Sequence, residues 1–522
     1  MAPSISTPVY CALIAGIYGV YAHFEFFGLT SPLPWSQPKQ PLLLHAFLLP
    51  QTLLLAALCT PLARKPVAAV FLPPILASFW HLLGTGASSS AFGYAIGTAT
   101  AFMLFKTLEV LVFRDVRGTY RRYPTCGGEH RRTHTPDDGE GDSEAYPATI
   151  FARATWALDL MHALRGVGWN WCVRLPVSRP TGSRTRWLLR RVARGAAMLA
   201  WLDVLVWYVR VVDRGFFVPQ GVAMGFEPGE GVPYPSLFAG STKPLMTYPV
   251  PAGFPAMPEG GWVRVVYAAA LHALRTLLGA SAMYTTISGM YTAVALLCVL
   301  SGAVLGLPYP LPSGFPARWL APEAWPDAFG SWRDGDFGAG VRGWWGRGWH
   351  GLFRCAFTAP AGWLVQELRL APSGGVAALL YATVPFAASA ALHFAGCWTQ
   401  SNGGFGAARF FLLQPLGILL EAAVARGWRR VGGHVPWLEK ASPYVWTTVW
   451  MCVTSTSFFE DYRWGGVWTV EPIPFSVIRG RTDLWVSKQD SGWLVRWVDS
   501  AEQGGVMGSW GVLLGGGAAA GK

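Results

Sequence analysis

The chain has 522 residues, of which 52% are hydrophobic and only 13% are charged, and its formal net charge is +12. A soluble globular protein has about 25% charged residues, so this composition excludes an ordinary water-soluble enzyme and predicts an integral membrane protein. The positive charge lies in loops between apolar segments, which favours contact with anionic lipid headgroups over nucleic acid. We therefore expect membrane lipids, and no nucleic acid, as partners.

The eight cysteines are scattered along the chain without a C-x-x-C pair. This pattern indicates neither a disulfide framework nor a zinc site. Cys126, His130 and His134 recur at intervals of four, but their segment is polar, and a solvated loop is favoured over a metal site. We expect no metal and no bound cofactor.

The first 113 residues form an N-terminal region of four apolar segments, each close to the roughly 20 residues that a membrane span needs. Pro73 and Pro74 predict a kink or break in the third segment. Lys106 and Glu109 lie three positions apart on one helical face of the fourth, where they can pair, and we favour a structural role for them. The four segments are Val9–Leu29, Leu42–Leu62, Val67–Leu83 and Ala91–Phe113.

Residues 114–195 form a polar, arginine-rich segment, which the positive-inside rule places on the cytosolic side. Within it, Trp156–Pro176 begins with helical spacing of apolar residues. Gly166 and Gly168 then predict a turn, and the tryptophans beside them are typical of the membrane surface. We therefore expect an amphipathic helix lying on the bilayer.

Residues 196–460 form the main membrane region, in which we expect several further spans. The segment Trp262–Leu278 contains Arg264, His272 and Arg275, so its pattern leaves open whether it crosses the bilayer or lies at its surface. Thr358–Leu370 is a short or re-entrant apolar piece. The expected spans are Ala196–Val212, Met283–Leu305, Val376–Gly396, Phe410–Val424 and Tyr444–Phe459, with loops at Phe216–Gly261, Pro308–Arg354 and Trp398–Gly406.

The sequence thus predicts an all-α bundle of about 8–10 transmembrane helices, followed by a C-terminal tail over residues 461–522. The tail is polar and aromatic at first and then rich in Gly and Ala. The oligomeric state does not follow from these patterns.

Two histidines are candidates for catalysis. His393 lies in the apolar segment Val376–Gly396, where an ionisable side chain is costly and points to function, although a hydrogen bond to a neighbouring helix is a structural alternative. His350 lies in a loop rich in Trp and Arg. A histidine can take the proton of a hydroxyl during acyl transfer, and arginines can hold the phosphates of a CoA thioester. A proton relay in a transporter is a second use of a buried histidine.

Four blocks of sequence, in the same order, resemble the wax synthase-like branch of the membrane-bound O-acyltransferase (MBOAT) superfamily, in its fungal form. WWGRGWHGLFR (Trp344–Arg354) is similar to the signature F-W-x-R-x-W-H-x-x-x-R. FAASAALHFAG (Phe386–Gly396) matches the S-G-L-x-H segment that carries the catalytic histidine of that family. The other two blocks are ALDLMHALRGVGWNW (Ala157–Trp171) and FFLLQPLGILLEAAV (Phe410–Val424).

This resemblance implies an MBOAT-type fold with an internal reaction chamber, in a multi-pass protein of the endoplasmic reticulum. It implies an acyl-CoA-dependent O-acyltransferase that transfers an acetyl or fatty acyl group to a hydrophobic alcohol, such as a terpenoid secondary metabolite or a long-chain alcohol. A proton-coupled transporter and an inactive scaffold of the same fold are the alternatives. By this resemblance His393 is the general base and His350 positions the thioester. The residues expected to bind substrate are Trp345, Arg347, Trp349, Arg354 and Gln414.

Overall fold

The computed structural model describes residues 40–86, 90–123, 143–171, 183–213, 250–307, 317–331, 336–401, 404–431, 434–464, 467 and 476–478. About three quarters of these residues are helical. The strands β1 (Gln40–Pro41) and β2 (Thr85–Gly86) are two residues long each and pair in parallel. The predicted all-α fold is confirmed. The expected first span, residues 9–29, lies outside the described residues, as does most of the expected loop that follows residue 213.

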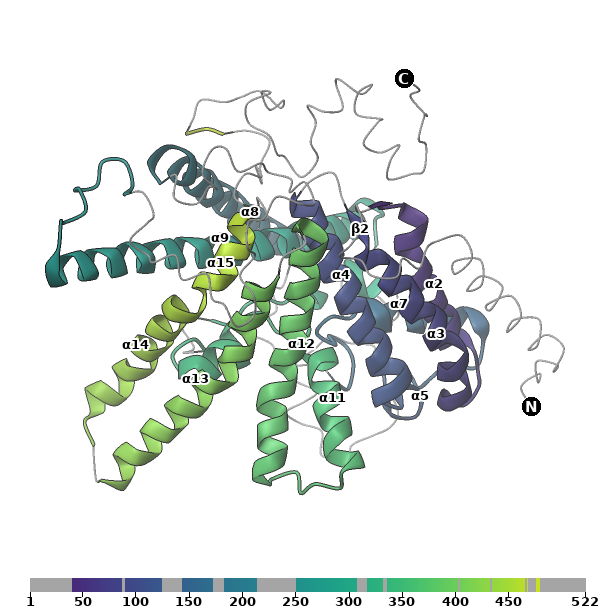
Figure 1. Cartoon of the computed structure of the whole chain (residues 1–522). Coiled ribbons are helices and arrows are strands. Elements are labelled where there is room, and N and C mark those ends of the chain that lie inside the picture. The colour runs from purple at the N-terminus through teal and green to yellow at the C-terminus, as the bar shows by residue number, and fades with distance from the viewer. Residues whose placement is uncertain are drawn as a thin grey trace.

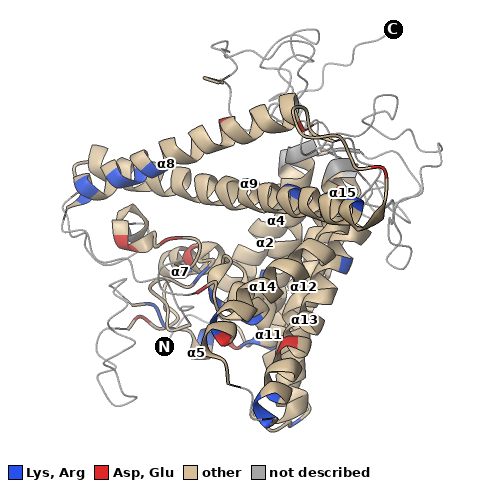
Figure 2. Ribbon diagram, turned by 90° about the vertical axis from the view of Figure 1, so that its left-hand side faces the viewer, with Lys and Arg blue, Asp and Glu red and all other residues tan. Residues whose placement is uncertain are grey.

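In the described part of the chain, five helices are long and apolar enough to cross a membrane. Figure 2 shows basic residues gathered at the end of one of these five helices, α13 (Phe405–Arg430). Such a distribution suits helices whose middles lie in hydrocarbon. The five segments are residues 64–83, 93–113, 261–304, 375–400 and 405–430, and the helix α2 (Leu44–Cys59) is apolar but shorter.

The helices of the N-terminal region follow the predicted segments. Helix α3 (Arg64–Leu83) continues through Pro73 and Pro74, so the predicted break is absent. Helix α4 (Ser90–Leu108) is extended by a π-helical turn, η1 (Glu109–Phe113). Together these elements cover the predicted second, third and fourth spans.

The predicted amphipathic helix is α7 (Ile150–His162), and the turn after it occurs at Gly166 and Gly168, which have φ of +64° and +76°. Its surroundings differ from the prediction. Trp156 and Trp169 are buried in the core that contains α2 and α3, and their rings meet edge to face at 5.2 Å. The apolar face of α7 is therefore covered by protein, and Trp169 packs inside the molecule instead of at the membrane surface.

Two predicted segments, Trp262–Leu278 and Met283–Leu305, belong to one helix, α9 (Gly261–Val304), which has 44 residues. The residues between them, Gly279 to Ala282, include no proline, so nothing in the backbone ends the helix there. At about 1.5 Å per residue such a helix is about twice as long as the hydrocarbon core is thick. It cannot stand upright within one bilayer over its whole length.

Helix α8 (Arg184–Trp207) lies alongside α9, and Figures 1 and 2 both show the pair running across the other long helices. The predicted span Ala196–Val212 is only the second half of α8 and the short η3 (Tyr208–Val212). The first half is rich in arginine, and Arg191 donates to Asp327 at 2.8 Å. The helix as a whole is amphipathic and is not among the candidate spans.

Two predicted boundaries in the C-terminal half are wrong. Helix α12 (Gly375–Ser401) continues past Trp398 into the predicted loop, because Trp398 is buried and the Thr399 hydroxyl donates to the carbonyl of Gly93 at 2.7 Å. The predicted last span is divided at Ser455 into α14 (Pro436–Thr454) and α15 (Thr456–Trp464).

Close packing around α12 brings distant segments to one place (Figure 1). Helix α4 crosses α12 at a pair of glycines: a Cβ atom on Gly97 would lie 2.2 Å from the carbonyl oxygen of Ala395, and one on Gly396 would lie 2.7 Å from the ring of Tyr94. Small residues let helix backbones approach closely. Helices α11 (Arg354–Glu367) and α13 (Phe405–Arg430) also pack on α12, and α15 packs on α13.

Candidate active site

The imidazole of His393 is enclosed by aromatic side chains from helices other than its own. It stacks on Phe411 of α13 at 4.3 Å between ring centroids and meets the ring of Phe458 of α15 edge to face at 5.6 Å. Its Nδ1 atom lies 2.5 Å from the hydroxyl oxygen of Tyr94 of α4. His393 of α12 is therefore hydrogen-bonded to a neighbouring helix and packed against two others.

His350 follows the turn η8 (Trp344–Gly348) and packs among Phe329, Trp349 and Phe353, at 5.6 to 5.9 Å between ring centroids. Its Nδ1 atom is covered and has no hydrogen-bond partner in the part of the chain that the structure describes. Burial, together with the nearby positive charge of Arg165, lowers the pKa of His350 to about 4. The ring is therefore neutral near pH 7, and its Nδ1 atom can donate or accept a hydrogen bond, depending on the tautomer.

The two histidines, 43 positions apart in the chain, belong to one site. A series of aromatic contacts joins them: Trp349 touches His350, Trp345 lies 6.1 Å from Trp349, and Trp345 lies 5.7 Å from Phe411, which stacks on His393. These contacts are consistent with the juxtaposition expected from the sequence, while the shared chamber and the chemical roles of the two rings stay predictions.

Trp345 and Gln414 are in direct contact. The indole N–H of Trp345 donates to Oε1 of Gln414 at 3.1 Å, and the amide of Gln414 donates to the carbonyl of Phe410 at 2.8 Å. Gln414 is fully buried. This residue thus holds the loop before α11 against the middle of α13, on the side where Phe411 supports His393.

The two arginines predicted to bind substrate differ in their exposure to solvent and in their partners. Arg347 is 44% exposed and forms an ion pair with Asp336 at 3.7 Å. Arg354, at the start of α11, is partly buried and donates from Nη2 to the carbonyl of Gly346. Arg354 therefore closes the turn that carries Trp345, while Arg347 presents its charge toward the outside of the same turn.

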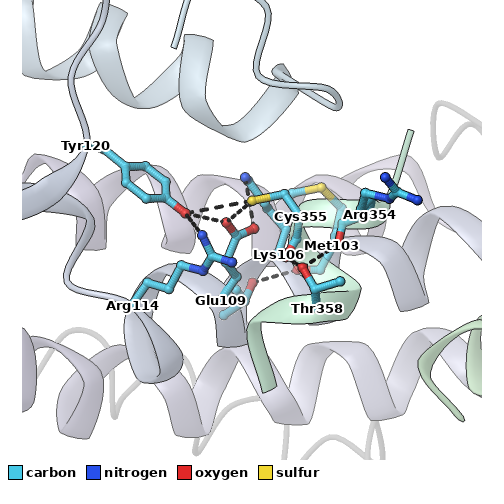
Figure 3. A network of polar contacts seen from close by, with 9 residues as sticks. Met103, Lys106, Glu109, Arg114, Tyr120, Arg354, Cys355 and Thr358 are labelled. Atoms are coloured by element: carbon cyan, nitrogen blue, oxygen red, sulfur yellow. Dashed lines mark hydrogen bonds and ion pairs between the residues drawn. The ribbon is translucent and has the colours of Figure 1, made fainter. Parts of the chain in front are cut away.

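A buried polar network lies behind this turn (Figure 3). The predicted pair is confirmed: Nζ of Lys106 lies 3.0 Å from the carboxylate of Glu109, and both side chains are buried. The same carboxylate accepts from the hydroxyl of Tyr120 at 2.7 Å and from the thiol of Cys355 at 3.2 Å. Since Cys355 follows Arg354, the network ties α4 and the segment after α5 (Val116–Thr119) to the start of α11.

Sequence reasoning missed the residues that contact the histidines from elsewhere in the chain. Tyr94, Phe458 and Tyr462 had no role assigned, and no pattern in the sequence links them to His393. Arg165 lies in a block that carried the family resemblance, yet its proximity to His350 follows only from the structure.

Metal ligands do not gather in the described residues, where no three His, Cys, Asp or Glu side chains are placed to hold an ion. Cys126, His130 and His134 lie outside the described residues.

The helices and their composition define an integral membrane protein. Residues 325–413, which include both histidines and η8, match the model of the membrane bound O-acyl transferase family. The chain is similar to that family over this segment, and the relatives described next are fungal.

Several curated fungal proteins are similar to the chain. Acetyltransferase ple2 of Rhodocybe pseudopiperita is 27% identical over 58% of the chain and 65% of its own length. Acetyltransferase aurG of Calcarisporium arbuscula is 25% identical over 78% of the chain and 89% of its own length. O-Mevalon transferase yanI of Aspergillus niger is 25% identical over 74% of each chain. The chain thus spans slightly less than two thirds of ple2. No solved structure matches it.

Proposed function

We propose that this protein is a membrane-embedded O-acyltransferase, which transfers an acyl group from acyl-CoA to the hydroxyl of a hydrophobic alcohol. The observation that carries the proposal is the series of aromatic contacts that joins His350 to His393, within the segment that matches the family. A single neutral imidazole in a helix has many structural uses. Two of them, in contact with a tryptophan-lined turn, suit proton transfer next to a bound thioester.

In the proposed reaction His393 is the general base. Its Nε2 takes the proton of the acceptor hydroxyl, and the oxygen attacks the carbonyl carbon of the thioester. The new C–O bond forms, the C–S bond breaks, and the CoA thiolate takes the proton back from His393 to leave as the thiol. His350, kept neutral by burial and by Arg165, positions or polarises the thioester carbonyl. Exclusion of water by the aromatic shell protects the acyl group from hydrolysis.

The turn before α11 is the proposed donor side. Arg347 is exposed and basic, which suits the phosphates of CoA. Trp345 and Trp349 line the path from that charge toward His393. Arg354 and Gln414 hold the turn in place through Gly346 and Trp345.

The names of ple2 and aurG favour acetyl-CoA as the donor, and a terpenoid or other secondary metabolite as acceptor fits a site made of aromatic rings. A long-chain alcohol with a fatty acyl donor is the second pairing that the same chemistry allows. We place the protein in the endoplasmic reticulum, among membrane lipids, where hydrophobic acceptors collect.

The test is an assay of membranes that contain the full chain. They are incubated with acetyl-CoA or palmitoyl-CoA and a panel of hydrophobic alcohols, and new esters are sought by mass spectrometry. We expect ester from at least one pair, and none from the His393→Ala variant at equal protein level. His434→Ala is the matched control, because the His434 side chain is exposed and forms an ion pair with the likewise exposed Glu439. Proton-coupled uptake without ester would favour a transporter, and neither activity would favour an inactive scaffold.

A further inference from the structure

Two tyrosines hold the Nδ1 side of His393. The Tyr94 hydroxyl lies 2.5 Å from Nδ1, and a hydrogen bond of 2.5 Å joins the hydroxyls of Tyr94 and Tyr462. The rings of the two tyrosines meet edge to face at 5.0 Å between centroids. The three residues come from α4, α12 and α15, so the contact exists only in the folded protein.

Each tyrosine is held in place by the packing of its own helix. Gly97 and Gly396 allow α4 and α12 to approach closely, and this crossing sets Tyr94 against His393. Tyr462 is buried, and its neighbour Asp461 accepts a hydrogen bond from the backbone N–H of Ala407 at 2.7 Å, at the start of α13. Neither hydroxyl is therefore a freely rotating group at a surface.

We propose that Tyr94, backed by Tyr462, is the positioning residue that orients His393 for acyl transfer. The inference rests on the proposed function and deepens it. A hydrogen bond at Nδ1 fixes the plane of the imidazole and leaves Nε2 as the atom that faces the reacting groups. The sequence resemblance identified His393 but neither tyrosine, and the contact of the tyrosine pair with His393 follows only from the structure.

A phenol pair suits a histidine that gains and loses a proton. For Nε2 to take the substrate proton, Nδ1 must carry the hydrogen, so the Tyr94 oxygen accepts from Nδ1–H in the neutral ring and in the imidazolium alike. The Tyr462 hydroxyl donates to the same oxygen. The hydrogens of Nδ1 and of the two hydroxyls therefore stay in place while Nε2 takes and returns the substrate proton.

The experiment compares Tyr94→Phe, Tyr462→Phe and the double variant in the ester assay. We expect Tyr94→Phe to lower kcat by about 10- to 100-fold, the loss typical of one hydrogen bond to a group that becomes charged, with KM for acyl-CoA unchanged. Tyr462→Phe should lower kcat less. The double variant should match Tyr94→Phe alone, because Tyr462 acts through Tyr94. The control is Tyr381→Phe, a change to a half-exposed tyrosine of α12.

A second readout is independent of turnover. In membranes that contain the protein with isotope-labelled histidine, the nitrogen NMR signal that disappears in His393→Ala should shift in Tyr94→Phe and stay in place in Tyr381→Phe. Full kcat in Tyr94→Phe overturns the proposal, and so does an unchanged histidine signal. If the wild-type protein makes no ester but its His393 signal shifts in Tyr94→Phe, the proposed function fails while the orienting contact stands.

Discussion

The indole N–H of Trp345 donates a hydrogen bond to Oε1 of Gln414, which lies 3.1 Å away and 69 positions later in the chain. The contact joins the turn before α11 to the helix that supports His393. Gln414 also lies 3.3 Å from the hydroxyl of Thr454, so three segments depend on one buried amide.

Gln414→Leu should therefore weaken both the fold and the reaction. The change leaves the buried N–H of Trp345 without an acceptor, which costs about 1 to 3 kcal/mol. We expect a lower melting temperature in detergent and a lower kcat. Gln366→Leu, at an exposed position of α11, should leave both values unchanged. Equal melting temperatures for Gln414→Leu and the wild type would contradict this account of the contact.

The pair of Lys106 and Glu109 should behave as a buried salt bridge. Lys106→Met leaves the carboxylate of Glu109 without its cation, and loss of one partner from a buried pair typically costs about 3 to 5 kcal/mol. We expect the double variant Lys106→Met with Glu109→Leu to be more stable than either single variant. Thermal unfolding in detergent measures this. The exposed pair His434 and Glu439 is the control, where Glu439→Gln should cost at most about 1 kcal/mol. The pairing would be refuted if the stability losses of Lys106→Met and Glu109→Leu simply added up in the double variant.

Arg354→Ala should raise the KM for acyl-CoA by about 10-fold or more, because the change frees the turn that carries Trp345 and removes a cation from the donor side. The KM for the alcohol should change little. Arg426→Ala, at an exposed arginine of α13, is the matched control for lost surface charge. An unchanged KM in Arg354→Ala would mean that this arginine serves the fold alone.

His350 should make the protein less stable in acid. Its pKa in the folded state is lowered to about 4 by burial and by Arg165, below the value of 6.5 for an exposed histidine. Between these two values the unfolded chain binds more protons than the folded one, so stability falls as pH drops from about 6.5 toward 4. We expect the melting temperature to fall over that range, and His350→Gln to remove part of the fall.

Asp461 contributes a slope of opposite sign over the same range. Burial raises its pKa to about 7, although the backbone N–H groups of Ala407 and Gly406 act in the other direction. The folded state therefore keeps this proton where the unfolded chain has lost it, and stability falls as pH rises from about 4 toward 7. Comparison of His350→Gln and Asp461→Asn with the wild type separates the two effects. A pH profile that is the same in all three proteins would contradict both pKa shifts.

Much of the helical framework could be predicted from the chain. Long apolar runs require a membrane, and a backbone inside hydrocarbon must satisfy its hydrogen bonds within the helix, so segments such as Val376–Gly396 are helical in any fold they join. The Lys106 and Glu109 pair was predictable for a similar reason, since a spacing of three places both on one face. The predictions that failed concerned where helices end and where they are interrupted. Local pattern did not reveal that α9 is continuous, nor that α12 continues past Trp398.

The sequence by itself determined that the protein is embedded in a membrane and that His350 and His393 are the candidate catalytic residues. Both conclusions depend only on residue types and on their local order along the chain. Which side chains contact each imidazole was decided by the tertiary structure alone. Tyr94 reaches His393, and Tyr462 reaches Tyr94, through the close helix packing that Gly97, Gly396 and Gly406 allow. Contacts between residues 299 and 368 positions apart leave no periodic trace in either segment.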